Sequence, residues 1–116
     1  MTINESISTI DARYPNNTPR STKIQYLSRL DRLVSDKVMN KEFTPYTEDT
    51  DGNTKLLVDE PYTDIYVFWL QAWIDYWNGD YDKYNTAIMM YQSVYDAFAK
   101  DYNSKHSSST TQFKFF

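Results

Sequence analysis

The carboxylates around one predicted turn are the side chains of this sequence best placed to do chemistry. Asp75, Asp80 and Asp82 flank the dipeptide Asn78-Gly79, and clustered carboxylates can bind a divalent cation or share a proton. Acidic residues at such a turn also serve as helix N-caps and as solvated charge, and this second use is the commoner one. We therefore expect no metal site at this turn.

Other candidates for chemistry are equally weak. The segment DTDGN at 49–53 matches the beginning of a calcium-binding loop, but Glu60 stands in the wrong context to close that loop as its bidentate ligand. The single histidine, His106, precedes a polar stretch and suits a helix C-terminus, where it interacts with the helix dipole. There is no cysteine, no glycine-rich phosphate loop and no base to activate a serine. The sequence predicts a protein that is not an enzyme and binds no cofactor.

The composition indicates one acidic, aromatic-rich domain. The 116 residues can bury one modest core, and 17% aromatic residues with only two glycines favour an all-α fold. A net charge of −4 gives no general affinity for nucleic acid or for an anionic membrane. The N-terminus has no signal-peptide pattern, and the longest apolar region, 65–77, is shorter than the ~20 residues that span a bilayer. We expect a protein made in a reducing cytoplasm, with no membrane partner.

Two helices are predicted in the first forty residues. Thr2 and Glu5 form the capping box of the first helix, and Pro15 ends it. The second helix begins between Thr18 and Thr22, where either threonine could be its N-cap. It has one apolar stripe, and its opposite face is polar. The stripe consists of Ile24, Leu27, Leu30, Leu33, Val34 and Val38.

The segment from Lys41 to Glu60 interrupts the helical pattern with turn signals. The short apolar run Lys55–Val58 is expected to pair with Phe43–Tyr46 in a small β-hairpin, across the Asp51-Gly52 turn. A loop of this length in a compact domain more often has a functional or docking role than a merely connecting one.

A central hairpin of two helices follows this loop. The third helix begins near Pro61 and ends at Asn78-Gly79, where Gly79 adopts the left-handed conformation of a helix C-terminus. The fourth begins near Tyr81 and continues to about Tyr102. The predicted fold is an all-α, four-helix bundle-like domain over residues 1–103.

Both hairpin helices are apolar around most of their circumference, and such helices are buried on most sides. Aromatic side chains recur at helical spacing along each of these helices and form an aromatic seam on each. The simplest interpretation of these aromatic seams is a bundle core. The narrow stripes of the first two helices cannot cover both seams, so the remainder predicts self-association or a large protein partner. The candidate interface residues are Tyr62, Tyr66, Trp69, Trp73, Tyr91 and Tyr95.

The region Leu56–His106 resembles the head–tail connector, or head-completion, proteins of tailed bacteriophages and prophages. The shared pattern contains L-L-x-x-x-P-Y-x-x-x-Y, an aromatic helix, I-D-x-x-N-G-x, Y-x-x-Y-N and Y-N-x-x-H. The segments TIN and LSRLD near the N-terminus are similar too. The matching positions are Leu56, Leu57, Pro61, Tyr62, Tyr66, Ile74, Asp75, Asn78, Gly79, Tyr81, Tyr84, Asn85, Tyr102, Asn103 and His106.

This resemblance implies a structural protein of the virion neck, assembled in the host cytoplasm as part of the DNA-packaging machinery. Its implied partners are further copies of itself in a ring homo-oligomer, a dodecamer in the family, together with the portal protein and a tail or second neck protein. DNA is expected only to pass through the channel. Ring size, the order within the neck and the face that meets the portal stay open.

Two other function classes remain open at this point. The aromatic seam could be a platform for a sugar or another flat ligand, which would make the protein a ligand-binding helical module. The protein could instead be a generic helical adaptor in a regulatory complex. Exposed Trp69 and Trp73 side chains would favour the platform, whereas buried ones would favour a core or a ring seam.

Charge is unevenly distributed along the chain. Residues 13–41 carry seven basic and two acidic side chains, whereas residues 42–116 carry five basic and twelve acidic ones. Solvated charge explains such patterning in most proteins. In a ring, it would also suit head-to-tail docking of a basic face on a neighbour's acidic face.

The segment 104–116 is predicted to be a flexible C-terminal tail, a polar stretch followed by FKFF. Phe113, Phe115 and Phe116 are costly to leave in water, at ~1.5–3 kcal/mol each when burial is available. The polar stretch is long enough to reach beyond its own protomer. We expect the tail to dock as an arm on a neighbouring subunit or on the portal.

Overall fold

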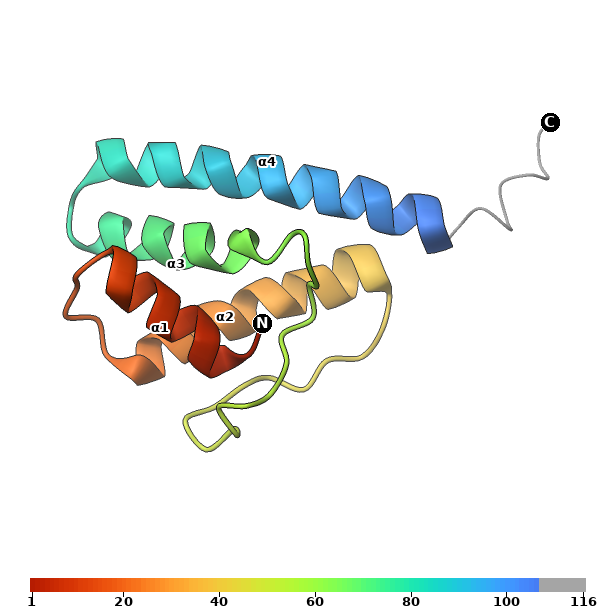
Figure 1. The fold of residues 1–116 in the computed structure, drawn as a ribbon, viewed down its shortest axis with the longest axis horizontal. Helices are drawn as coiled ribbons and strands as arrows, with labels where there is room; N and C mark the ends of the chain where they lie inside the picture. The colour runs from red at the N-terminus through yellow and green to blue at the C-terminus, as the bar shows by residue number, and fades with distance from the viewer. Residues whose placement is uncertain (107–116) are drawn as a thin grey trace.

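The computed structural model describes residues 1–106 and is built from helices, with α3 at its centre (Figure 1). α4 packs along one side of α3, whereas α1 and α2 pack against the other side, and within the described residues α2 and α4 do not pack together. The described chain contains no β-strand, so the predicted all-α fold is confirmed. The helices are α1 (Ile3–Arg13), α2 (Arg20–Val34), the π-helix η1 (Ser35–Met39), α3 (Asp64–Trp77) and α4 (Tyr81–His106).

The N-terminus of α1 forms the predicted capping box. The Glu5 N–H donates to Thr2 Oγ1 at 3.1 Å, and the Thr2 N–H donates to Glu5 Oε1 at 2.8 Å. This arrangement satisfies backbone donors that the first turn of a helix leaves without partners. It also directs the apolar face of α1 into the core, where Ile3, Ile7 and Ile10 are buried.

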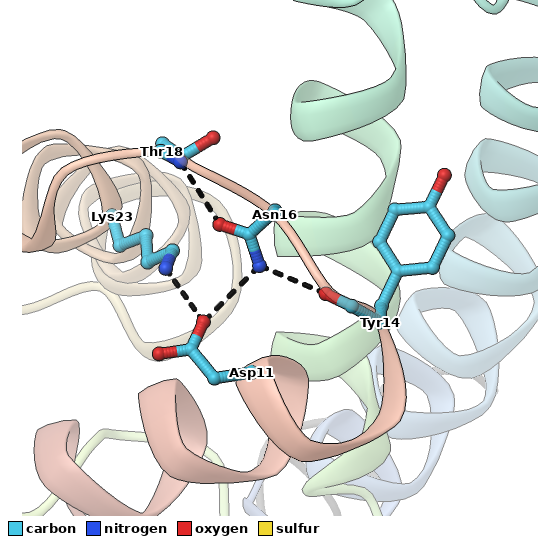
Figure 2. A network of polar contacts seen from close by, with 5 residues as sticks. All are labelled: Asp11, Tyr14, Asn16, Thr18 and Lys23. Atoms are coloured by element: carbon cyan, nitrogen blue, oxygen red, sulfur yellow. Dashed lines mark hydrogen bonds and ion pairs between the residues drawn. The ribbon is translucent and has the colours of Figure 1, made fainter.

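The turn between α1 and α2 is organised by Asn16 and not by a threonine cap (Figure 2). The Asn16 amide donates to Asp11 Oδ1 at 3.1 Å and to the Tyr14 carbonyl at 2.9 Å, and its oxygen accepts from the Thr18 N–H at 3.0 Å. Asp11 also pairs with the buried Lys23 at 2.6 Å. These contacts close the turn before the helix begins.

The predicted threonine cap of α2 was therefore wrong. Pro19 occupies the N-cap position of α2 without a side-chain hydrogen bond. At the other end, α2 continues into η1, which closes at Asn40 in the left-handed conformation (φ 55°). Of the predicted apolar stripe, Leu33 is the exception, since it is 37% exposed.

The predicted β-hairpin in the long loop was also wrong. Lys55 forms an isolated antiparallel bridge with Thr2, and no strand forms between Phe43–Tyr46 and Lys55–Val58. The cause lies at the start of α1, whose first N–H groups have no partner within the helix. The Ile3 N–H donates to the Thr54 carbonyl at 3.1 Å. The next N–H, that of Asn4, donates to the Gly52 carbonyl at 2.9 Å.

The α3–α4 hairpin forms as predicted, and Gly79 has a φ of +79°. The Gly79 N–H donates to the Tyr76 carbonyl at 3.1 Å, and the Asp80 N–H donates to the Asp75 carbonyl at 2.9 Å. This pair of bonds is a Schellman motif, which requires a residue with positive φ after the last helical residue. The motif ends α3 and lets α4 begin two residues later, at Tyr81.

Two helix boundaries differ from prediction. α3 begins at Asp64, three residues after Pro61. Turns precede it, and in the first of them the Tyr62 N–H donates to the Asp59 carbonyl at 3.0 Å. α4 continues to His106, beyond the expected boundary at residue 103. The expected tail docking through Phe113, Phe115 and Phe116 lies outside the described residues.

Candidate functional site

A buried carboxylate anchors the long loop to the helical core. Asp31 lies on α2 and is fully buried, and it accepts hydrogen bonds from the Tyr66 hydroxyl (2.6 Å), the Tyr46 hydroxyl (2.5 Å) and the Leu57 N–H (3.0 Å). The Tyr66 hydroxyl also accepts from the Val58 N–H at 2.7 Å. This Asp31 cluster therefore joins α2, α3 and two points of the loop.

The electrostatics of the Asp31 cluster indicate a structural anchor. Burial raises the pKa of Asp31, although the hydrogen bonds from Tyr46 and Tyr66 act in the opposite direction. Burial, together with the nearby Asp31 carboxylate, also raises the pKa of both tyrosines. A carboxylate closed off from solvent and surrounded by donors holds structure, and it has no access to a substrate. Sequence reasoning missed this role, although Asp31 lies four residues after Leu27 on the apolar stripe.

Several predicted interface residues are part of the core. Tyr66, Trp69 and Tyr91 are buried within a single protomer, which leaves little of their surface for an interface. The Trp69 indole N–H donates to the Tyr26 carbonyl at 2.7 Å, and its ring lies 4.8 Å from that of Tyr91. The two helices of the hairpin cover one another more completely than their seams suggested. Helices α3 and α4 pack together along most of α3 (Figure 1).

The other three candidates are partly buried at the edges of the same seam. Tyr62 donates from its hydroxyl to Asp101 Oδ2 at 3.0 Å and packs edge-on against Phe98. Trp73 and Tyr95 pack against the core without being enclosed by it. Each of the three keeps part of its side chain exposed.

The acidic residues at the α3–α4 turn have separate roles. Asp75 is fully buried and accepts a hydrogen bond from the Tyr14 hydroxyl, and burial and then Asp80 raise its pKa. Asp80 accepts from the Lys83 N–H at 3.3 Å and so caps the first turn of α4. Asp82 is exposed in that same turn. Asp75 Oδ2 and Trp73 Nε1 are buried without a hydrogen-bond partner among the described residues.

The most exposed aromatic side chains among residues 1–106 lie at the end of the hairpin, outside the predicted set of interface residues. Trp77 is 70% exposed and Tyr81 is 59% exposed, and both rings contact Tyr76, with centroids 5.2 and 5.7 Å away. We call these three residues the aromatic tip. Trp77 is the last residue of α3. Its position directly before Asn78-Gly79 was the signal available in the sequence.

A second surface lies on α2, on the face opposite its buried stripe. An open cavity of about 320 Å³ is lined by two arginines together with polar and aromatic side chains, and we call it the basic groove. Tyr46 forms one wall, held there by the Asp31 cluster and by a bond from its N–H to Ser28 Oγ at 3.0 Å. Its lining residues are Gln25, Ser28, Arg29, Arg32, Pro45 and Tyr46.

The opposite charge is concentrated on the loop and not on α4. Residues 42–64 hold seven acidic side chains against Lys55 alone, whereas α4 has three acidic and three basic ones. The polarity predicted between α2 and the rest of the chain is therefore a polarity between α2 and the loop. The loop passes close to α2, since the Tyr46 N–H donates to Ser28 and the Leu57 N–H donates to Asp31.

The remaining candidates for chemistry are groups of metal-ligating side chains and the single histidine. Within residues 1–106 there is no group of three metal-ligating side chains, and no helix there is both long and apolar enough to cross a membrane. His106 stacks on Tyr102 with ring centroids 3.8 Å apart, at the end of α4. Comparison with models of protein families, with curated proteins and with solved structures finds no match for this chain.

Proposed function

We propose that this protein is a non-enzymatic head–tail connector of a tailed bacteriophage, which forms a ring beneath the portal around the DNA channel. The observation that carries the proposal is the aromatic tip, where Trp77 and Tyr81 stay exposed although the chain has a well-filled aromatic core. Exposed aromatic surface of this kind marks protein–protein contacts. The sequence resemblance to neck proteins supplies the biological setting and the partners, which are the portal and a tail or second neck protein.

A ring needs two different surfaces that fit one another, because rotation brings one face of each protomer onto another face of its neighbour. The aromatic tip and the basic groove meet this requirement. Arg29 and Arg32 present guanidinium groups that can stack on the rings of Trp77 and Tyr81, and each such contact contributes ~0.5–2 kcal/mol. Asp80 and Asp82 lie beside the tip and complement the arginines in charge.

The alternative of a sugar-binding platform on the α3 seam is not supported. Trp69 is only 8% exposed, and the rings of Trp73 and Tyr91 pack against it, with centroids 5.6 and 4.8 Å away. A platform for a flat ligand needs an aromatic ring with one face open to solvent, and Trp69 does not provide one. The seam is filled by the protein itself, which leaves assembly as the better use of the remaining aromatic surface.

The test is to measure assembly of the purified protein, alone and with portal protein, by light scattering and cryo-microscopy. We expect a ring with the portal, and we expect Trp77→Ala and Arg29→Glu each to weaken its formation at least ~10-fold, which corresponds to ~1.4 kcal/mol. Met89→Ala is the matched control, because Met89 is as exposed as Trp77 and lies outside both surfaces. A protein that stays monomeric and does not bind the portal would contradict the proposal.

A further inference from the structure

An apolar depression, separate from the basic groove, lies near His106, where the described part of the chain ends. The depression, which we call the α4 groove, has a volume of about 240 Å³ and lies between the last turns of α4, the end of η1 and the loop before α3. Its floor is apolar and partly aromatic, and its rim carries three acidic side chains together with Lys105 and His106. The floor consists of Met39, Leu57, Tyr62, Phe98 and Tyr102, and the acidic residues are Asp59, Glu60 and Asp101.

The acidic side chains of the rim are only partly neutralised by basic neighbours. Asp101 already pairs with Lys105 at 3.2 Å and accepts from the Tyr62 hydroxyl. Asp59 has only a long, exposed contact with Lys55 at 3.8 Å, and exposed pairs of this kind contribute little. Glu60 is exposed as well. The groove therefore suits an apolar segment that carries a positive charge.

We propose that the α4 groove binds Phe113–Phe116 of its own chain. This segment has the required chemistry, three phenylalanines and one lysine, Lys114. In an extended segment Phe113 and Phe115 face the same side, so both can lie on the apolar floor while Lys114 reaches the acidic rim. The proposal does not depend on the connector function. It replaces the docking on a neighbouring subunit that the sequence alone predicts.

The tether has the right length for its own groove. His106 lines the groove, and six residues, 107–112, separate it from Phe113. Six extended residues reach at most ~20 Å. The floor from Phe98 to His106 extends eight residues along a helix, which is ~12 Å. A tether of only six residues also gives an effective concentration in the millimolar range, so the attached segment outcompetes that of a second protomer in dilute solution.

Methionine methyl groups provide a direct test, because the chain has four methionines and only Met39 lines the groove. The full-length protein and a variant ending at Thr111 would be labelled with [13C]methyl-methionine and compared by NMR. We expect the aromatic rings of the segment to shift the Met39 methyl signal in the full-length protein, and truncation to remove that shift. Met89 and Met90, exposed on α4 away from the groove, serve as internal controls.

Two further samples separate the sources of any shift. The full-length triple variant Phe113→Ser, Phe115→Ser, Phe116→Ser should reproduce the truncated spectrum, because the rings and not the chain length cause the effect. Dilution should leave the Met39 shift unchanged, since docking within one protomer does not depend on concentration. A Met39 signal that is identical in the full-length and truncated proteins, or a shift that disappears on dilution, would overturn the proposal.

Discussion

Replacing Tyr66 with phenylalanine removes one oxygen atom from the centre of the Asp31 cluster. The Tyr66 hydroxyl donates to Asp31 Oδ1 and accepts from the Val58 N–H, and all three residues are fully buried. Loss of a hydrogen bond to a charged group costs ~1.5–3 kcal/mol, and a buried N–H left without a partner costs ~1–3 kcal/mol. The losses are coupled and not fully additive. We expect Tyr66→Phe to lower the free energy of unfolding by about 2–4 kcal/mol.

The assay is urea unfolding followed by tryptophan fluorescence, with the free energy obtained by linear extrapolation. A domain of about this size loses ~4 °C in Tm for each kcal/mol, so a thermal melt should shift by roughly 8–16 °C. Tyr62→Phe is the matched control, because it removes a hydroxyl that donates to Asp101 at the surface. We expect the control to change stability much less. If Tyr66→Phe were as stable as Tyr62→Phe, the Asp31 cluster would not be the anchor described above.

Three other outcomes are expected. Gly79→Val should cost ~1–2 kcal/mol in urea unfolding, from backbone strain alone, because φ is +79° and an added Cβ meets nothing within 4 Å; a wild-type midpoint would contradict this. Trp77→Ala should leave the Tm of the protomer within about 2 °C of wild type, since the side chain is exposed, and a large loss would place it in the core. Burial raises the pKa of Asp31 in the folded state, so the folded protein binds a proton at this side chain more readily than the unfolded chain does, and protonation of Asp31 favours folding as pH falls from 7 toward 4. The stability difference between wild type and Asp31→Asn should therefore shift in favour of wild type over that range, and a constant difference in urea unfolding would refute it.

The features that sequence reasoning predicted correctly depend on residues a few positions apart. The Thr2–Glu5 capping box closes within one helical turn. The Schellman motif at Gly79 depends on a residue free to adopt positive φ immediately after a periodic apolar run. Such signals keep their meaning in any tertiary context, which is why the helices and the hairpin could be located.

The features that it missed depend on which distant groups meet. The carbonyls of Gly52 and Thr54 could have paired within a hairpin, and instead they accept from the first N–H groups of α1, about fifty residues away. The residues next to these carbonyls do not show whether a hairpin strand or the start of α1 will supply the N–H donors. Asp31 shows the same limit, because an acid on an apolar stripe signals a buried partner without saying that Tyr46 and Tyr66 are the donors.

Tyr66 and Trp77 show why periodicity separates core from surface poorly on this protein. Both lie on the apolar circumference of α3, and helical angle alone places them side by side in the same class. They differ in their position along the helix, because Tyr66 bonds to Asp31 of α2 and to Val58 of the loop, whereas Trp77 is the last residue of α3 and is 70% exposed. One residue is therefore part of the core, and the other stays exposed.

Folding and assembly should consequently respond to different variants. Tyr66→Phe weakens an anchor inside the protomer, so it should lower the unfolding midpoint and still allow rings to form while the protein stays folded. Trp77→Ala removes exposed ring surface, so it should leave the midpoint unchanged and impair assembly with the portal. The two effects arise on one helix, eleven residues apart. If both variants lost stability and assembly together, the aromatic tip would be an extension of the core, and the ring contact would have to be sought elsewhere on the protomer.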